Sequence, residues 1–117
     1  MGRMTSISGG CPKSSPDAWN KLDWIEKHVS QGTRVNQTVC RSMIGQVNDT
    51  IDALLDYASH MIQTNDAIAA HAAQTAYDML VRLSEIANKG YEETEPETHK
   101  RHMRTNRARA ILYPYYH

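Results

Sequence analysis

Two runs of apolar residues at heptad spacing follow one another in this chain, and they limit its fold more than any other feature. The first run covers residues 40–61 and the second covers residues 69–86, and in each the apolar side chains recur after three and then four residues. This spacing places them on one side of an α-helix. Because the capping residues Thr64, Asn65 and Asp66 interrupt the pattern, we expect an antiparallel helical hairpin over residues 36–89.

The two runs differ in side-chain size near the expected turn. The second run is rich in alanine there, whereas the first run ends in larger aliphatic side chains. The residues concerned are Ala67, Ala69, Ala70, Ala72 and Ala73 in the second run, and Leu54, Leu55, Met61 and Ile62 in the first. Small side chains allow two helix axes to approach closely, so large and small residues can interdigitate across the hairpin. The chain contains no Phe, so we expect an aliphatic core.

A shorter helix is expected before the hairpin. Ser15 and Pro16 are favourable as an N-cap and a first helical residue. The apolar residues that follow, at positions 18, 22, 25 and 29, form one narrow stripe on a helix. Gly32 is expected to end this helix, because glycine adopts the left-handed conformation of a helix C-cap at little cost.

A fourth helix is expected near the end of the chain. Thr94 and Glu97 have the spacing of a capping box, and Pro96 falls in the first turn. The helix should run to about Leu112 and end before Pro114. Its apolar residues do not form one stripe, so we expect that hydrophobic burial alone does not hold it firmly.

These elements predict an all-α helical bundle built on a long antiparallel hairpin, with a short N-terminal helix and a basic C-terminal helix. We divide the chain into a flexible N-terminal arm (residues 1–14), a helical bundle domain (residues 15–90) and a segment with an acidic linker, the basic helix and a Tyr-rich tail (residues 91–117). No apolar run reaches about 18 residues, so we expect no transmembrane helix. Two cysteines without an export signal indicate reduced thiols, so we expect a cytoplasmic location.

Charge is distributed unevenly along the chain, although the net charge is zero. Residues 1–96 contain eight Lys or Arg and twelve Asp or Glu, whereas residues 97–117 contain five Lys or Arg and one Glu. The basic residues and the aromatic residues after them are Lys100, Arg101, Arg104, Arg107, Arg109, Tyr113, Tyr115 and Tyr116. Cations neutralise phosphates and tyrosine rings stack on unpaired bases, so this segment indicates nucleic-acid binding as one hypothesis. The competing interpretation is a helix that is solvated or paired with protein.

The expected second helix has an acidic stripe that offers the basic helix such a partner. Asp49, Asp52 and Asp56 lie on its outer face, opposite the apolar seam. We expect this stripe either to be solvated or to pair with the basic helix, within one subunit or between subunits. Exposed ion pairs contribute only about 0–1 kcal/mol each, so such pairing would mainly orient the helix.

Two further features indicate protein contacts. Trp24 lies off the apolar stripe of the first helix, and tryptophan on a polar face is a candidate interface anchor unless another part of the chain covers it. On the third helix, Ala70, Ala73, Tyr77 and Val81 form a second apolar strip beside the seam. We expect the first helix to cover part of this strip and a second copy of the chain to cover the rest, which predicts a homo-oligomer, a dimer or larger.

No motif in the sequence specifies a reaction. Asp56 and His60 are four residues apart and could reach one metal ion, but no third ligand completes a site. Cys40 belongs to the apolar seam, and Gly9-Gly10 does not follow a strand as a phosphate-binding loop would. We therefore expect neither an enzyme nor a cofactor. The leading hypothesis is a small non-enzymatic interaction protein, namely an oligomeric adaptor, inhibitor or assembly component, and the alternative is a nucleic-acid-binding protein.

Overall fold

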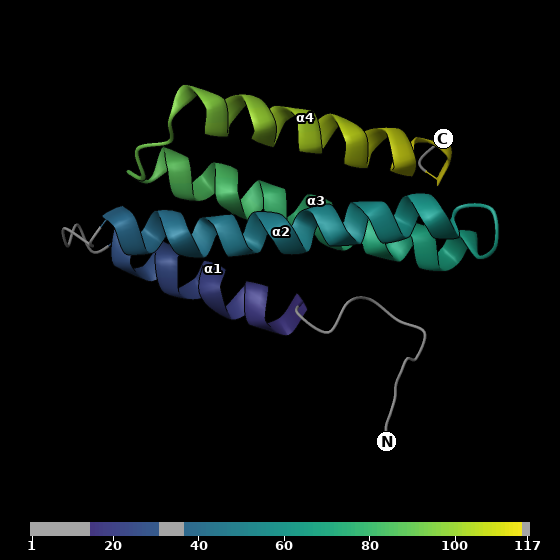
Figure 1. Ribbon diagram of the computed structural model, residues 1–117, viewed down its shortest axis with the longest axis horizontal. Coiled ribbons are helices and arrows are strands. Elements are labelled where there is room, and N and C mark those ends of the chain that lie inside the picture. Colours follow the sequence, from purple (N-terminus) through teal and green to yellow (C-terminus); the bar gives the residue numbers. More distant parts are fainter. Residues whose placement is uncertain (1–14, 31–36, 116–117) are drawn as a thin grey trace, which may run out of the picture.

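The computed structural model describes residues 15–30 and 37–115, and these residues form a bundle of four α-helices (Figure 1). The helices are α1 (Ser15–Ser30), α2 (Gln37–Met61), α3 (Asp66–Asn88) and α4 (Glu95–Leu112), and a short 3₁₀ helix, η1 (Tyr113–Tyr115), follows α4. The described residues contain no strand, so the predicted all-α bundle is confirmed. None of the helices described is long and apolar enough to cross a membrane. The N-terminal arm, Gly32, Asn36 and Tyr116 lie outside the described residues.

The helices α2 and α3 form the predicted antiparallel hairpin, joined by a short turn (Figure 1). The Asn65 backbone N–H donates to the Met61 carbonyl at 2.8 Å, and the Asn65 side chain accepts a hydrogen bond from the Ile68 N–H at 3.2 Å. Asn65 is thus the N-cap of α3, as the sequence indicates. At the other end Gly90 has a φ of 132°, a conformation that residues with a Cβ rarely adopt.

The core follows the two heptad runs. Leu54 and Leu55 of α2 and Ala69, Ala72 and Ala76 of α3 are fully buried. These alanines and leucines belong to one core cluster, in agreement with the expected size complementarity, whereas Ala67 and Ile62 of the expected set are exposed. Cys40 lies in the same seam as a buried free thiol.

The helix α1 packs on one side of the hairpin, through its buried residues Ala18, Leu22 and Ile25. Ion pairs border this contact, because Arg82 of α3 binds both Asp23 and Glu26 of α1, at 2.9 and 2.6 Å. The predicted narrow stripe of the first helix is therefore its buried face.

The helix α4 packs on the opposite side of the hairpin from α1, against α3 and α2 (Figure 1). Its start has the predicted capping box between Thr94 and Glu97. Towards its end Ala108, Ile111 and Leu112 are buried in the common core. The sequence indicated that the apolar residues of this helix do not form one stripe, but these three lie within about 100° on a helical wheel and give α4 a short apolar contact, to which its ion pairs add. The hydrophobic core thus extends beyond residue 90.

Candidate protein-interaction groove

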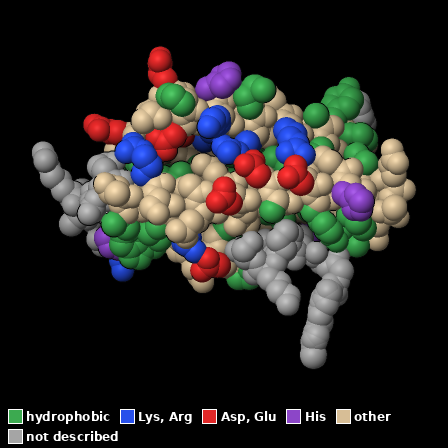
Figure 2. Space-filling model, in the orientation of Figure 1, with side chains coloured by type: hydrophobic (Ala, Val, Ile, Leu, Met, Phe, Trp, Pro, Cys, Tyr) green, Lys and Arg blue, Asp and Glu red, His purple; other side chains and the backbone are tan. Residues whose placement is uncertain are grey.

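Ion pairs join α4 to the acidic face of α2. Arg104 binds Asp52 through two hydrogen bonds, from Nε to Oδ1 at 2.7 Å and from Nη2 to Oδ2 at 3.1 Å. One turn further along, Arg107 Nη2 donates to Asp56 Oδ1 at 2.7 Å. Figure 2 shows acidic and basic side chains beside one another along this border. The acidic stripe and the basic helix therefore pair within one chain, and Asp49, which is exposed, takes no part in an ion pair among the described residues.

The two ion pairs should differ in their contribution to stability. The Arg107 and Asp56 side chains are 42% and 72% exposed, so we expect Arg107→Ala to lower the free energy of unfolding by less than about 1 kcal/mol. We expect a larger loss for Arg104→Ala, because Arg104 is more buried and binds its carboxylate with two parallel hydrogen bonds. Urea denaturation of the two variants measures both values. Equal losses would contradict the assignment of Arg104 as the main polar link between α4 and α2.

A second polar contact lies where α4 begins. Arg101 binds Glu93 through two hydrogen bonds of 2.9 Å, and Thr98 Oγ1 donates to the same carboxylate at 2.8 Å. The Arg101 and Glu93 side chains are only 15% and 14% exposed. Burial by itself raises the pKa of Glu93, but the hydrogen bonds from Arg101 and Thr98 outweigh it and hold the pKa below its ordinary value. Glu93 is thus a largely buried carboxylate that depends on Arg101.

The linker before α4 is fixed on α2 by a neighbouring network. Tyr91 is buried, and its hydroxyl donates to Glu97 Oε2 at 2.8 Å. Burial, and next the hydrogen bond to Glu97, raise the pKa of Tyr91 well above its ordinary value. Arg41 of α2 lies 5.6 Å from the centre of the Tyr91 ring and donates to the Glu92 carbonyl at 3.0 Å. These contacts place the first turn of α4 against the first half of α2.

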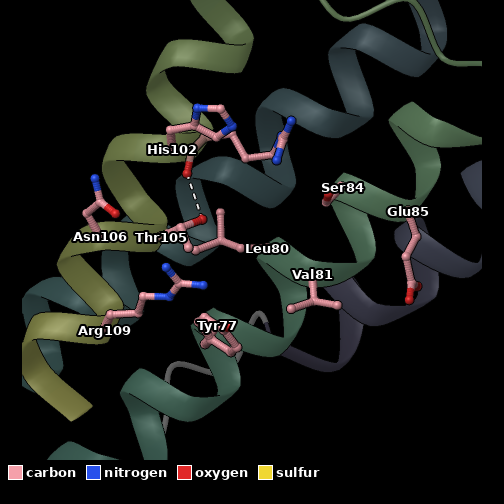
Figure 3. Close-up of a pocket in the computed structure, with 10 residues that line it drawn as sticks. Tyr77, Leu80, Val81, Ser84, Glu85, His102, Thr105, Asn106 and Arg109 are labelled. Atoms are coloured by element: carbon pink, nitrogen blue, oxygen red, sulfur yellow. Dashed lines mark hydrogen bonds between the residues drawn. The ribbon is translucent and has the colours of Figure 1, made fainter. Parts of the chain in front are cut away.

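A groove of about 490 Å³ lies between α3 and α4 (Figure 3). Tyr77, Leu80 and Val81 of α3 provide its apolar surface, and Val81 is 40% exposed. The polar residues that line it are Ser84, Glu85, Arg101, His102, Thr105, Asn106 and Arg109. The groove therefore combines an exposed aliphatic side chain and a tyrosine with polar walls on both helices.

Arg109 marks one end of the groove. Its guanidinium carbon lies 5.9 Å from the centre of the Tyr77 ring, a distance typical of a cation–π contact. Beyond this pair lies a second, more apolar depression of about 550 Å³, to which Leu112 and Tyr113 contribute. The two depressions share Tyr77 and Arg109, and Tyr113 in the second is 66% exposed.

The structure thus unites residues that the sequence assigned to two different hypotheses. Tyr77 and Val81 were expected in a protein interface, whereas Arg101, Arg109 and Tyr113 were expected on nucleic acid, and all five line one groove or its extension. Ala73, which belongs to the same expected strip of α3, is fully buried and offers no surface. The helix α4 also lies along this side of α3, which the expected cover by the first helix and a second copy did not include, yet Val81 remains 40% exposed.

The remaining predicted residues lie away from the groove. Trp24 is exposed on α1, where its ring stacks on His28 with the ring centres 3.8 Å apart. The helix α4 does not cover it, because α4 lies on the opposite side of the hairpin (Figure 1). Lys100 is exposed on the side of α4 that faces α2, and Tyr115 lies in η1.

Sequence reasoning missed Glu85 and His102 as surface residues of the groove. The available signal was the spacing of Tyr77, Val81 and Glu85, each four residues from the next, which places them on one face of α3.

In the described parts of the chain, no three His, Cys, Asp or Glu side chains gather in a way that could hold a metal ion. Comparison of the chain with protein-family models, with curated proteins and with solved structures gave no significant match.

Proposed function

We propose that this chain is a small non-enzymatic interaction protein whose protein partner binds in the α3–α4 groove. The observation that carries the proposal is the groove itself, which is lined by Tyr77 and the exposed Val81 of α3 and by polar residues of α4. Tyrosine and arginine are enriched among the residues that dominate binding energy at protein interfaces, and here Tyr77 and Arg109 already contact each other. Their mutual contact holds both side chains in place, which lowers the entropic cost of binding.

The ion pairs of α4 favour a protein partner over nucleic acid. Arg101, Arg104 and Arg107 each bind a carboxylate of the same chain. A phosphate would have to displace these carboxylates, and for Arg101 it would leave a largely buried Glu93 uncompensated. Lys100 and Arg109 are the cations of α4 that take part in no ion pair within the described residues, and two cations provide little counterion release.

Site-specific photo-cross-linking tests the proposal in cells that naturally produce the chain. We expect p-benzoylphenylalanine in place of Val81 to give a protein adduct, because Val81 lines the groove and is 40% exposed. The same residue in place of Ala53, which is exposed beside the contact of α1 with α2, serves as the matched control and should give none. Mass spectrometry of the adducts identifies the cross-linked peptide.

Two results would contradict the proposal: absence of any adduct specific to position 81, or salt-dependent binding of short nucleic acids. The second is measured by fluorescence anisotropy with the full chain and the double variant Lys100→Glu/Arg109→Glu. A chain that ends at Gly90 is a poor control, because Ala108, Ile111 and Leu112 belong to the core and their removal exposes it. If the full chain binds with a steep salt dependence that the double variant loses, nucleic acid becomes the ligand of α4.

A further inference from the structure

On the outward face of α3, two residues lie at equal distances on either side of Val81. Val81 is exposed at the centre of this face, Tyr77 lies four residues before it and Glu85 four residues after it. At 1.5 Å per residue, each lies about 6 Å from Val81 along the helix. Neither α1 nor α4 covers Val81, which remains 40% exposed.

The two ends of this face carry opposite charges. Arg109 of α4 lies over Tyr77 at one end, and Glu85 lies at the other end (Figure 3). Both side chains are exposed, and neither takes part in an ion pair among residues 15–30 and 37–115. A partner that fits this face must therefore present a negative charge at the Tyr77 end, a positive charge at the Glu85 end and an apolar side chain between them.

A second copy of the same face meets this requirement when it is turned end to end. We infer that the partner in the α3–α4 groove is another copy of this chain, docked with its α3 antiparallel to the first about a two-fold axis at Val81. The inference rests on the proposed function and names its partner. Closed two-fold dimers require a surface that is complementary to itself, and opposite charges placed symmetrically about an apolar centre provide this.

In this arrangement each copy supplies the apolar side chain and the opposite charges that the face of the other copy requires. The Val81 side chains meet at the axis, and Arg109 of each copy lies opposite Glu85 of the other, so two equivalent ion pairs border the apolar contact. The Tyr77 hydroxyl of each copy lies near the same Glu85 and can donate to it. A parallel arrangement would instead place Glu85 against Glu85, and directly opposed like charges are unfavourable. The charges therefore select the antiparallel register.

Charge reversal tests the register. We expect Arg109→Glu and Glu85→Arg each to weaken the dimer about tenfold or more, because each variant creates two like-charge contacts at the interface. The double variant Arg109→Glu/Glu85→Arg restores opposite charges and should return to within about threefold of the original dissociation constant. Lys100→Glu is the matched control, because it makes the same charge change on the other side of α4 and should have little effect. Sedimentation velocity over a concentration series measures the dissociation constants, and circular dichroism confirms that each variant is folded.

Disulfide trapping checks the position of the axis independently. In a Cys11→Ser background, Val81→Cys should form a disulfide-linked dimer under mild oxidation, because a residue on a two-fold axis meets its own copy. Cys40 is buried, so it does not compete, and Ala53→Cys serves as the control. Either of two results would overturn the inference: a monomer at every concentration tested, or a dimer that neither the charge reversals nor Val81→Cys affects. If the chain is monomeric but position 81 cross-links to another protein, the proposed function stands and only the identity of the partner is wrong.

Discussion

Replacing Arg101 with methionine is expected to destabilise the protein by about 2–4 kcal/mol, far more than the loss of any exposed ion pair. The substitution retains much of the aliphatic volume of Arg101 but removes the cation that binds Glu93. Because the Glu93 side chain is only 14% exposed, its carboxylate would then be largely buried without a cation, with the hydrogen bond from Thr98 remaining. Urea denaturation at neutral pH measures the loss.

The double variant Arg101→Met/Glu93→Gln is the control for this interpretation. Glutamine keeps an oxygen that can accept the hydrogen bond from Thr98 but carries no charge, so we expect the double variant to recover to within about 1 kcal/mol of the original protein. If the double variant is as unstable as Arg101→Met, then the packing of Arg101, and not the charge of Glu93, is responsible.

The same pair also gives an expected pH dependence. The pKa of Glu93 is lower in the folded chain than its ordinary value of about 4.3. Its contribution to stability is therefore fully present above about pH 5 and is lost as the pH falls through the folded pKa. The pKa of Glu97 is also lowered: burial raises it, but hydrogen bonds from Thr94 and Tyr91 outweigh burial. Glu97 therefore also contributes to the loss of stability in acid. In the Arg101→Met variant, the share of this pH dependence that comes from Glu93 should be absent, whereas the share from Glu97 should remain.

The second large effect is expected from the alanines of α3. Ala72→Leu should lower the free energy of unfolding by about 2–3 kcal/mol, because Ala72 is fully buried in the core and three added carbon atoms would force the packed helices apart. Ala67→Leu is the matched control, since Ala67 lies on the same helix but is exposed. Leucine and alanine have similar helix propensities, so the control should change stability by less than about 0.5 kcal/mol.

Thermal or urea denaturation distinguishes the two leucine variants. A loss near 2–3 kcal/mol at position 72 alone would indicate that close approach of the two helix axes requires small side chains. If both variants retain the original stability, the hairpin can spread to admit leucine, and the size complementarity between its two helices is not needed for folding.

The hairpin could be predicted from the sequence because its signal is periodic and local. Each heptad run specifies one buried face, and Asn65 caps α3 by a hydrogen bond to a residue three positions away. The capping box at Thr94 is equally local, and the structure has it as expected. Patterns of this kind depend on a few neighbouring residues, so they can be recognised without knowledge of the fold.

The position of α4 and the groove could not be predicted in the same way. The sequence offered pairing of the acidic stripe with the basic helix as one alternative, but it could not select that alternative, because the arginines bind Asp52 and Asp56 about 50 residues earlier and the helix also docks through three apolar residues near its end. Glu93 and Arg101 are eight residues apart and meet because the chain turns into the helix between them. The groove itself depends on how far α4 lies from α3, which no local pattern specifies. The sequence indicated Tyr77 and Val81 but not Glu85 or His102.

The uneven attachment of α4 has a consequence for how the protein opens. Its first half is held mainly by charged and hydrogen-bonding groups, whereas the seam between α2 and α3 is held by fully buried aliphatic side chains. Acid removes the charges of the carboxylates in the first kind of contact, whereas the aliphatic side chains of the seam do not titrate. We therefore expect the first half of α4 to open at a lower free energy than the seam between α2 and α3.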